Sequence, residues 1–136
     1  MRQYNLELNE EQMQTVQKAL ELYARLAIGQ WNMIGESLVD IEDDECAEKK
    51  WHLDAGMVKL RKIIFPDLPE DMGASYGVRA VPKACDAWEI YTVLRHCQAW
   101  TRNPEGGWTV DYDKPMSFSG KPLAKCTAVK STEEKV

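Results

Sequence analysis

Several kinds of motif are missing from this 136-residue sequence, and each absence excludes a class of protein. It contains no run of about 20 apolar residues, so we expect no membrane-spanning helix. The first twelve residues, MRQYNLELNEEQ, lack the apolar centre of a secretory signal. Eight glycines and six prolines are too few for a collagen-like or disordered chain. We therefore expect a globular cytoplasmic protein.

Common catalytic and cofactor motifs are also absent. The sequence has no Walker-type phosphate loop, no dinucleotide fingerprint and no Gly-x-Ser-x-Gly turn. Its four cysteines form no CxxC pair, and Cys85 and Cys97 are expected about 18 Å apart on one helix. We therefore predict reduced thiols and no cofactor.

Acidic residues are present in excess, but unevenly. Residues 1–72 hold 15 acidic and 8 basic residues, whereas residues 73–136 hold 7 acidic and 9 basic ones. The run from Glu36 to Glu48 contains seven acids and no base, which disfavours general nucleic-acid binding. The run is typical of a solvated helix end, although a metal site or an acidic patch facing a partner fits it too.

The size of 15.6 kDa suits one domain, which we place at residues 1–124, with a polar tail at residues 125–136. Apolar alternation predicts strands at residues 3–8 and 108–113, and a third at residues 116–118. Apolar stripes and capping residues predict a helix from Asn9 onward and further helices at residues 44–64 and 82–102. Whether residues 9–40 form one helix or two is left open. The fold class we expect is α+β, with three main helices packed on a small antiparallel sheet made from the N-terminal strand and a C-terminal hairpin.

The helix expected at residues 82–102 carries an aromatic and cationic stripe. At 100° per residue, Trp88, Tyr91, Arg95 and Arg102 fall in one sector, with Gln98 at its margin. Arginine beside aromatic rings can stack a planar ligand and bind a phosphate or carboxylate. The alternative is that the rings belong to the core while the arginines form surface ion pairs. His96 projects about 100° away from Arg95, so we expect it to be structural.

Two other clusters are candidates for chemistry. The loop at residues 74–78, ASYGV, offers Tyr76 and Gly77 as one side of a pocket, or as a turn that buries the ring. Glu45, Glu48 and His52 share one face of the helix at residues 44–64 and could hold a divalent cation, as in helical nucleotide pyrophosphohydrolases. A solvated face with salt bridges is the simpler interpretation of these three residues.

Three segments resemble a family of small uncharacterised proteins encoded by phages and prophages. They are ALELYARLAIGQW at residues 19–31, ASYGV at residues 74–78 and IYTVLRHCQAWTRNPEGGWTVDYDKPM at residues 90–116. The resemblance implies an accessory protein in a bacterial host cytoplasm that binds a host protein or small molecule. It implies no activity, cofactor or catalytic residue. Arg25 and Gln30, from the first segment, are candidates for a second wall of the pocket.

We favour a binding protein over an enzyme. The first hypothesis is a homo-oligomer that sequesters an anionic planar molecule, such as a nucleotide-like host signal. Its ligand-binding residues would be Arg25, Gln30, Tyr76, Gly77, Trp88, Tyr91, Arg95 and Arg102. The second is an acidic inhibitor that covers a basic surface of a host nucleic-acid or defence enzyme. The third is a metal-dependent nucleotide phosphohydrolase that uses Glu45, Glu48 and His52. None of these hypotheses involves a membrane.

Overall fold

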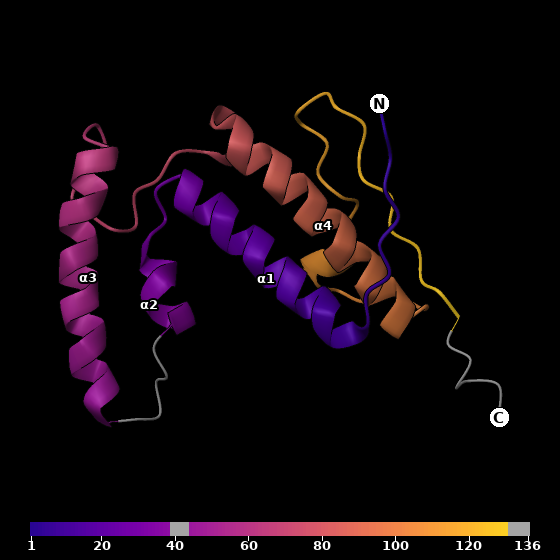
Figure 1. The fold of residues 1–136 in the computed structure, drawn as a ribbon, viewed down its shortest axis with the longest axis horizontal. Helices are drawn as coiled ribbons and strands as arrows, with labels where there is room; N and C mark the ends of the chain where they lie inside the picture. Colours follow the sequence, from indigo (N-terminus) through magenta and orange to yellow (C-terminus); the bar gives the residue numbers. More distant parts are fainter. Residues whose placement is uncertain (39–43, 131–136) are drawn as a thin grey trace.

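The computed structural model describes residues 1–38 and 44–130, without the side chains of residues 38 and 44–46. The described residues form four α-helices joined by loops and two short 3-10 helices, η1 and η2 (Figure 1). In chain order the elements are α1 (Glu10–Ala27), α2 (Asn32–Leu38), α3 (Asp44–Ile64), η1 (Val78–Ala80), α4 (Pro82–Arg102) and η2 (Val110–Tyr112).

The helices pack as two pairs. α1 packs lengthwise against α4, which runs in the opposite direction, and η1 and η2 both contact α4. The shorter α2 packs against α3, and this second pair lies at one end of the molecule (Figure 1). The N-terminus and the last described residues before position 131 lie on the side away from α3, so the long α1–α4 pair forms the middle of the described structure.

Local capping explains where α1 begins and ends. Asn9 and Gln12 form the predicted capping box, in which each side chain accepts a hydrogen bond from the other residue's backbone N–H at 2.8–2.9 Å. At the other end, the N–H of Gln30 donates to Arg25 and that of Gly29 to Leu26, which is a Schellman motif. Gly29 has a φ of +91°, which favours glycine. The described part of residues 9–40, which ends at residue 38, therefore forms two helices, α1 and α2.

Small side chains form the core between α1 and α4. Ala24 and Ala84 are fully buried, and Ala87 and Ile28 are almost so. Alanines at the contact let two helices approach closely, because the interaxial distance depends on side-chain size. Within α4, Ala87 is buried in this core, whereas Ile90 is 40% exposed.

The predicted α+β fold class is wrong, because none of the described residues forms a β-strand. Residues 3–8 are extended but unpaired, and Tyr4 and Leu6 are 85% and 76% exposed. Within residues 108–113 the chain forms η2, and residues 116–118 carry no regular structure. Alternating apolar and polar residues permit a strand, but a strand is stable only when its backbone pairs with a neighbouring strand. The three predicted main helices are present as α1, α3 and α4.

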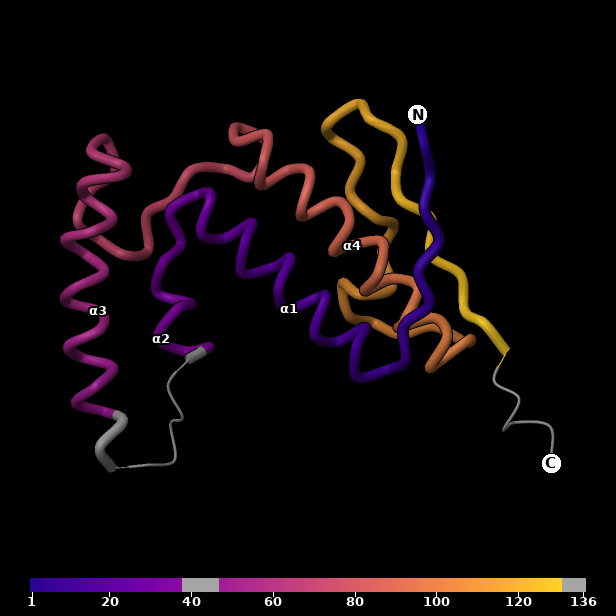
Figure 2. Tube along the Cα trace, viewed as in Figure 1, coloured from indigo at the N-terminus to yellow at the C-terminus, as the bar shows by residue number. Residues whose placement is uncertain are grey.

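A buried arginine connects the two helix pairs. Arg61 of α3 is 2% exposed, and its guanidinium donates to the backbone carbonyls of Gly29, Pro69 and Ala74, and more weakly to that of Asp71. Gly29 follows α1, whereas the other three carbonyls belong to the loop between α3 and α4. Figure 2 shows this loop passing the C-terminal end of α1 before it enters α4. The Arg61 side chain thus holds the loop between α3 and α4 against α3 and against the end of α1.

The segment after η2 follows α4 and is fixed by a buried carboxylate. Glu89, 5% exposed, accepts hydrogen bonds from the backbone N–H groups of Phe118 and Ser119 and from the Ser119 hydroxyl, at 2.5–2.7 Å. Burial alone would raise the pKa of Glu89, but the bonds from Ser119 and Phe118 outweigh it and lower the pKa below its ordinary value. The described part of the predicted tail, residues 125–130, has no helix, and residues 131–136 lie outside the described residues.

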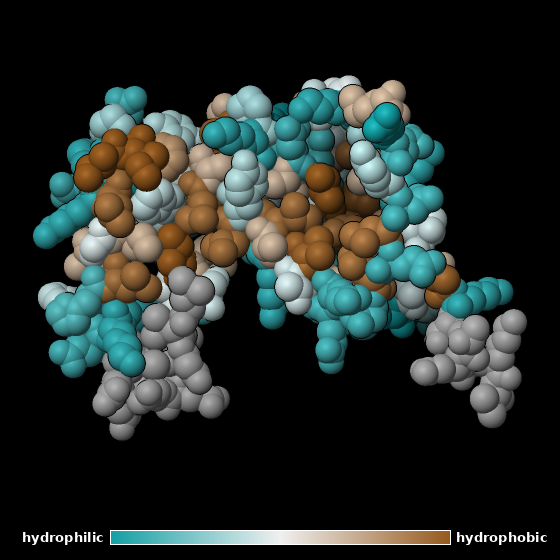
Figure 3. Space-filling view, in the orientation of Figure 1, coloured by the Kyte–Doolittle hydropathy of each residue, from teal (hydrophilic) through white to brown (hydrophobic). Residues whose placement is uncertain are grey.

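The molecular surface has an apolar area at the C-terminal end of α3. Leu60, Ile63 and Ile64 are 52%, 76% and 58% exposed there, and apolar side chains are visible over this end of the helix in Figure 3. No helix among the described residues is long and apolar enough to cross a membrane. The predicted homo-oligomer stays a prediction.

Candidate functional site

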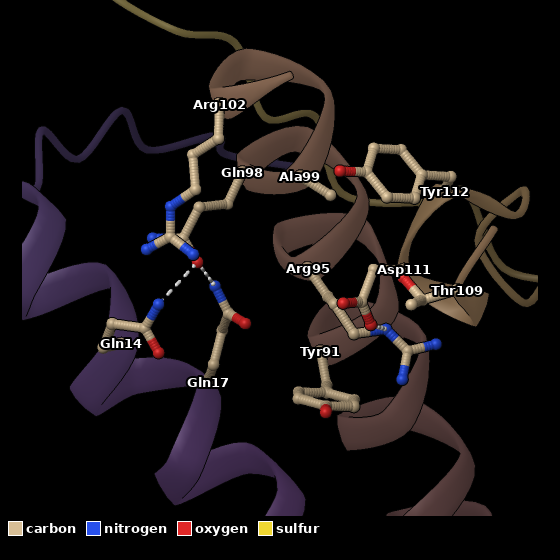
Figure 4. Close-up of a pocket in the computed structure, with 10 residues that line it drawn as sticks. All are labelled: Gln14, Gln17, Tyr91, Arg95, Gln98, Ala99, Arg102, Thr109, Asp111 and Tyr112. Atoms are coloured by element: carbon tan, nitrogen blue, oxygen red, sulfur yellow. Dashed lines mark hydrogen bonds and ion pairs between the residues drawn. The ribbon is translucent and has the colours of Figure 1, made fainter. Parts of the chain in front are cut away.

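A pocket of about 380 Å³ lies where α1, α4 and the η2 loop meet (Figure 4). Its volume falls in the range of small-molecule sites. Most of its lining side chains are polar or aromatic: Gln14, Gln17, Tyr91, Arg95, Gln98, Ala99, Arg102, Thr109, Asp111 and Tyr112.

One face of α4 supplies the main functional groups. Tyr91, Arg95, Gln98 and Arg102 follow each other at intervals of four, three and four residues, which places them along a single helix face. The stripe that the sequence predicts therefore contributes Tyr91, Arg95 and Arg102 to the pocket wall. The fourth residue of that stripe, Trp88, is not among the lining residues, although its ring lies 4.9 Å from that of Tyr91.

Arg95 links the aromatic part of the wall to the η2 loop. Its guanidinium carbon lies 5.1 Å from the centre of the Tyr91 ring, in cation–π geometry. Its Nε lies 3.4 Å from Oδ1 of Asp111, and the two side chains are 23% and 45% exposed. The ion pair holds the guanidinium beside the ring at the edge of the pocket.

Arg102 lies near the other end of the pocket, two helical turns further along α4. Its Nε donates to Oε1 of Glu10 at 2.7 Å, and both side chains are more than half exposed. Exposed pairs of this kind contribute little stability. Among the described residues, the terminal nitrogens of Arg95 and Arg102 have no hydrogen-bond partner, so both guanidinium groups retain donors for an anion.

Three glutamines form the side of the pocket between α1 and α4. The side-chain amides of Gln14 and Gln17 both donate to Oε1 of Gln98, at 3.0 Å and 2.7 Å. Gln98 is 6% exposed, and its Nε2 has no hydrogen-bond partner among the described residues. A buried donor without a partner costs about 1–3 kcal/mol, so this amide lowers the stability of the fold.

The other predicted site residues lie outside the pocket lining. Arg25 is positioned over the Trp88 ring at 5.4 Å and pairs with Glu21 and Gln30. Gln30 in turn donates to the Ser75 hydroxyl at 3.3 Å. This network joins α1 to the loop before α4, a structural task.

The ASYGV loop is likewise packed rather than open. The Tyr76 backbone N–H donates to the carbonyl of Ile28 at 2.9 Å, and its ring lies 5.7 Å from that of Phe65. Gly77 precedes η1 with a φ of −73°, so no left-handed conformation requires glycine there. Neither residue is brought to the pocket that Tyr91 and Arg95 line.

Several pocket residues were not predicted from the sequence. The sequence predicts Asp111 and Tyr112 in a strand, and Gln14 and Gln17 lie on the polar side of the apolar stripe of α1. Their approach to α4 depends on long-range packing, which periodicity within one helix does not reveal. Gln98 was placed at the margin of the α4 stripe, and that placement was the one available signal.

His96 lies outside the pocket and has a structural partner. Its Nδ1–H donates to the backbone carbonyl of Asp113 at 2.8 Å, and its ring lies 6.2 Å from that of Trp100. The Trp100 indole donates to the carbonyl of Tyr112 in the same loop. Both side chains therefore hold the loop that carries Thr109 and Asp111 against α4.

Two of the thiols, those of Cys85 and Cys126, are not prepared for nucleophilic chemistry. Cys85, Cys97 and Cys126 are unpaired by disulfides, and the side chain of Cys46 lies outside the described residues. Burial raises the pKa of Cys85, and burial together with a hydrogen bond to Cys97 raises the pKa of Cys126 to about 12. A thiol with so high a pKa stays protonated at neutral pH.

The predicted metal site falls partly outside the described residues. Glu48 and His52 lie 3.7 Å apart on α3 and are mostly exposed, while the Glu45 side chain is not described. Among the described residues, no three histidine, cysteine or acidic side chains are grouped to hold a metal ion. The acidic run at residues 36–48 also lies partly outside the described residues, at positions 39–43.

Comparison with known proteins gives no relative from which to transfer a function. The sequence matches no protein-family model, no curated protein and no solved structure. We therefore infer the function of this protein from the geometry of the pocket.

Proposed function

We propose that this protein binds an anionic, planar small molecule of the nucleotide type in the pocket between α1, α4 and the η2 loop. The observation that carries the proposal is the joint position of Tyr91, Arg95 and Arg102 on one pocket wall. Rings and guanidinium groups stack planar ligands, and guanidinium donors bind phosphate or carboxylate. A 380 Å³ pocket can accommodate much of a mononucleotide.

The stacking partners are held in position before any ligand enters. The Trp88 ring lies beside Tyr91, Tyr91 lies under Arg95, and Asp111 fixes the guanidinium from the η2 loop. A planar ligand would extend this series of stacked groups at little cost in side-chain entropy. The anion would then meet the unpartnered guanidinium nitrogens.

We further propose that the ligand is sequestered without turnover. The pocket groups named above donate hydrogen bonds and stack, which are the functions of a binding site. The resemblance of residues 19–31, 74–78 and 90–116 to phage-encoded proteins implies a host protein or a host small molecule as the target, and the aromatic and cationic pocket wall favours the small molecule.

A thermal-shift screen against nucleoside monophosphates, cyclic dinucleotides and ADP-ribose tests this proposal. A ligand that binds only the folded state raises Tm, by about 10 °C at about 100 times Kd for a domain of this size. Uncharged nucleosides should give a much smaller shift. Unchanged Tm with every compound at millimolar concentration would refute the proposal.

A pair of arginine variants locates the site. Arg95→Met should weaken binding of a nucleotide by about tenfold or more, because it removes both the cation–π partner and the anion donor. Arg25→Met is the matched control, since Arg25 also stacks on an aromatic ring but does not line the pocket. Equal losses of affinity in the two variants would place the ligand elsewhere.

A further inference from the structure

We propose that Cys97 and Cys126 form a reversible redox site, which closes to a disulfide by exchange with a small disulfide such as oxidised glutathione. Cys97 lies on α4, and Cys126 lies in the irregular segment that follows Gly120. Both cysteines are reduced in the structure. The inference does not depend on the proposed function, because neither thiol lines the pocket between α1 and α4.

The path of the chain after η2 brings the two cysteines together. This segment first runs along α4 in the opposite direction. Successive hydrogen bonds join Asp113 to His96, Met116 to Thr92, Ser119 to Glu89 and Lys121 to Asp86. Each pair lies closer to the start of α4 than the one before it, so residue 121 lies near the N-terminal end of the helix.

The chain then turns back along the same helix. Gly120 has a φ of +77°, a left-handed conformation that favours glycine in the turn. Beyond the turn, residues 121–124 and the α4 side chains of Asp86, Glu89 and Ile90 line a second pocket of about 300 Å³. Figure 2 shows the yellow end of the chain continuing from this turn toward the C-terminal end of α4.

The lengths of the two paths agree. An extended chain from Lys121 to Cys126 covers about 17 Å. The helix rises by about the same distance from Asp86 to Cys97. Because Lys121 is paired with Asp86, Cys126 arrives level with Cys97.

Both side chains face the contact between the helix and the returning segment. At 100° per residue, Asp86, Ile90 and Cys97 lie within about 40° of one another on α4. Within residues 121–130, Leu123 and Cys126 are half-buried, and the other residues are exposed. The Cys126 thiol is hydrogen-bonded to Cys97, so the two sulfurs are neighbours. A disulfide between such neighbours requires little movement of the backbone.

The bond forms in two thiol–disulfide exchange steps. The Cys97 thiolate attacks one sulfur of oxidised glutathione, which gives a mixed disulfide and releases a glutathione thiolate. The Cys126 thiolate then attacks the Cys97 sulfur and releases the second glutathione. The two cysteine protons go to the two glutathione thiolates. The protein thus loses two electrons and two protons, and oxidised glutathione is reduced to two thiols.

Cys126 acts second because it is held protonated in the reduced protein. Burial and the neighbouring Cys97 raise its pKa to about 12. A glutathione on Cys97 removes the charge and the hydrogen bond of that neighbour, so this part of the rise ends. The second step also joins groups that are already adjacent, which favours it over attack by a free thiol.

Mass spectrometry of the full chain tests this assignment. After incubation with oxidised glutathione and alkylation of free thiols, we expect a monomer in which trypsin releases residues 96–102 joined to residues 126–130. Dithiothreitol should separate the two peptides. The oxidised form should have a Tm about 10 °C higher than the reduced form, because the bond closes a loop of about 30 residues.

Variants then exclude the other cysteines. Cys126→Ser should abolish both the joined peptides and the rise in Tm, and it should leave glutathione attached to Cys97. Cys85→Ala is the matched control, because Cys85 lies on the same helix about 18 Å from Cys97. This variant should retain the joined peptides.

Three results would overturn the inference. They are thiols that all stay free, a disulfide that links Cys97 or Cys126 to another cysteine, and a mixed disulfide at Cys97 that persists in the wild type. Tyr91 and Arg95 lie about 140° and 180° from Asp86 around α4, so the nucleotide pocket is on the opposite face. Nucleotide binding and disulfide formation can therefore fail independently.

Discussion

Two carboxylates at the pocket edge already neutralise its guanidinium groups. Glu10 pairs with Arg102 and Asp111 pairs with Arg95. An anionic ligand must share these donors with the carboxylates and lie close to their negative charge. The acids therefore reduce the affinity of the site, while they hold the arginines in place.

Removing one of these charges should strengthen binding. We expect Asp111→Asn to increase the affinity for a nucleoside monophosphate by about threefold to tenfold, because the amide keeps the side-chain size but ends the repulsion. Titration calorimetry at low ionic strength measures the change. Asp86→Asn is the control, because Asp86 pairs with Lys121 at 2.9 Å outside this pocket. A weaker affinity in Asp111→Asn would show that the carboxylate contributes to the site.

At the scale of single residues, part of the pocket could be predicted from the sequence. Tyr91, Arg95 and Arg102 share one helix, so the 100° rotation per residue alone places them together. Gln17, Glu10 and Asp111 reach the same pocket from elsewhere in the chain. Their positions depend on how α1 and the η2 loop pack on α4, which no local pattern records.

At the scale of elements, Glu89 joins the segment at residues 116–121 to α4. Three donors at 2.5–2.7 Å satisfy the buried carboxylate, and they lower its pKa relative to the unfolded chain. Its contribution to stability is therefore complete above the unfolded value of 4.5. It is lost as the pH falls below that value and through the lower folded pKa.

The variant Glu89→Gln isolates this contribution. We expect a loss of about 2 kcal/mol in the free energy of unfolding at pH 7, because charge-assisted hydrogen bonds become neutral and one donor loses its acceptor. The difference from the wild type should shrink as the pH falls below 4.5 and through the lower pKa of the folded state, where the native carboxylate is protonated. Urea denaturation across this range measures it, with exposed Glu105→Gln as the control. If the difference in unfolding free energy stayed constant over this pH range, it would contradict an ionised Glu89 in the folded state.

The helices and the strands differ in how far sequence predicts them. α1 is specified locally, by the Asn9–Gln12 box at its start and by Gly29 at its end. A strand also requires a partner, and the exposed Tyr4 and Leu6 have none among the described residues. Near Trp108, which is fully exposed, the chain instead forms η2, and the carbonyls of Tyr112 and Asp113 accept hydrogen bonds from α4 side chains.

At the scale of the whole molecule, Arg61 holds the α2–α3 pair to the rest. Its charge is buried among backbone carbonyls, including that of Gly29 just after α1. Oxygens at and beyond a helix C-terminus carry partial negative charge, which favours a cation. The apolar side chains of Leu60 and Ile64 are exposed, whereas the charged Arg61 is buried. The loop that follows α3 folds back over the helix at Arg61 and covers this side chain.

Replacing Arg61 should therefore destabilise the whole domain. We expect Arg61→Met to cost about 3 kcal/mol or more, because it leaves several buried carbonyls without donors. Lys62→Met, at the exposed neighbouring position, should change stability by less than about 0.5 kcal/mol. Chemical denaturation, followed by circular dichroism, measures the free energy of unfolding of both variants. A cost below about 1 kcal/mol for Arg61→Met would show that the loop holds without it.

The most direct test of the central claim is a nuclear magnetic resonance titration of the labelled protein with a nucleoside monophosphate. We expect saturable shifts concentrated on Gln17, Tyr91, Arg95 and Arg102, which line the pocket. The resonances of Arg25 and Tyr76 should move little. Saturable shifts that map to α3 or to the ASYGV loop instead, or no shifts at millimolar nucleotide, would contradict it.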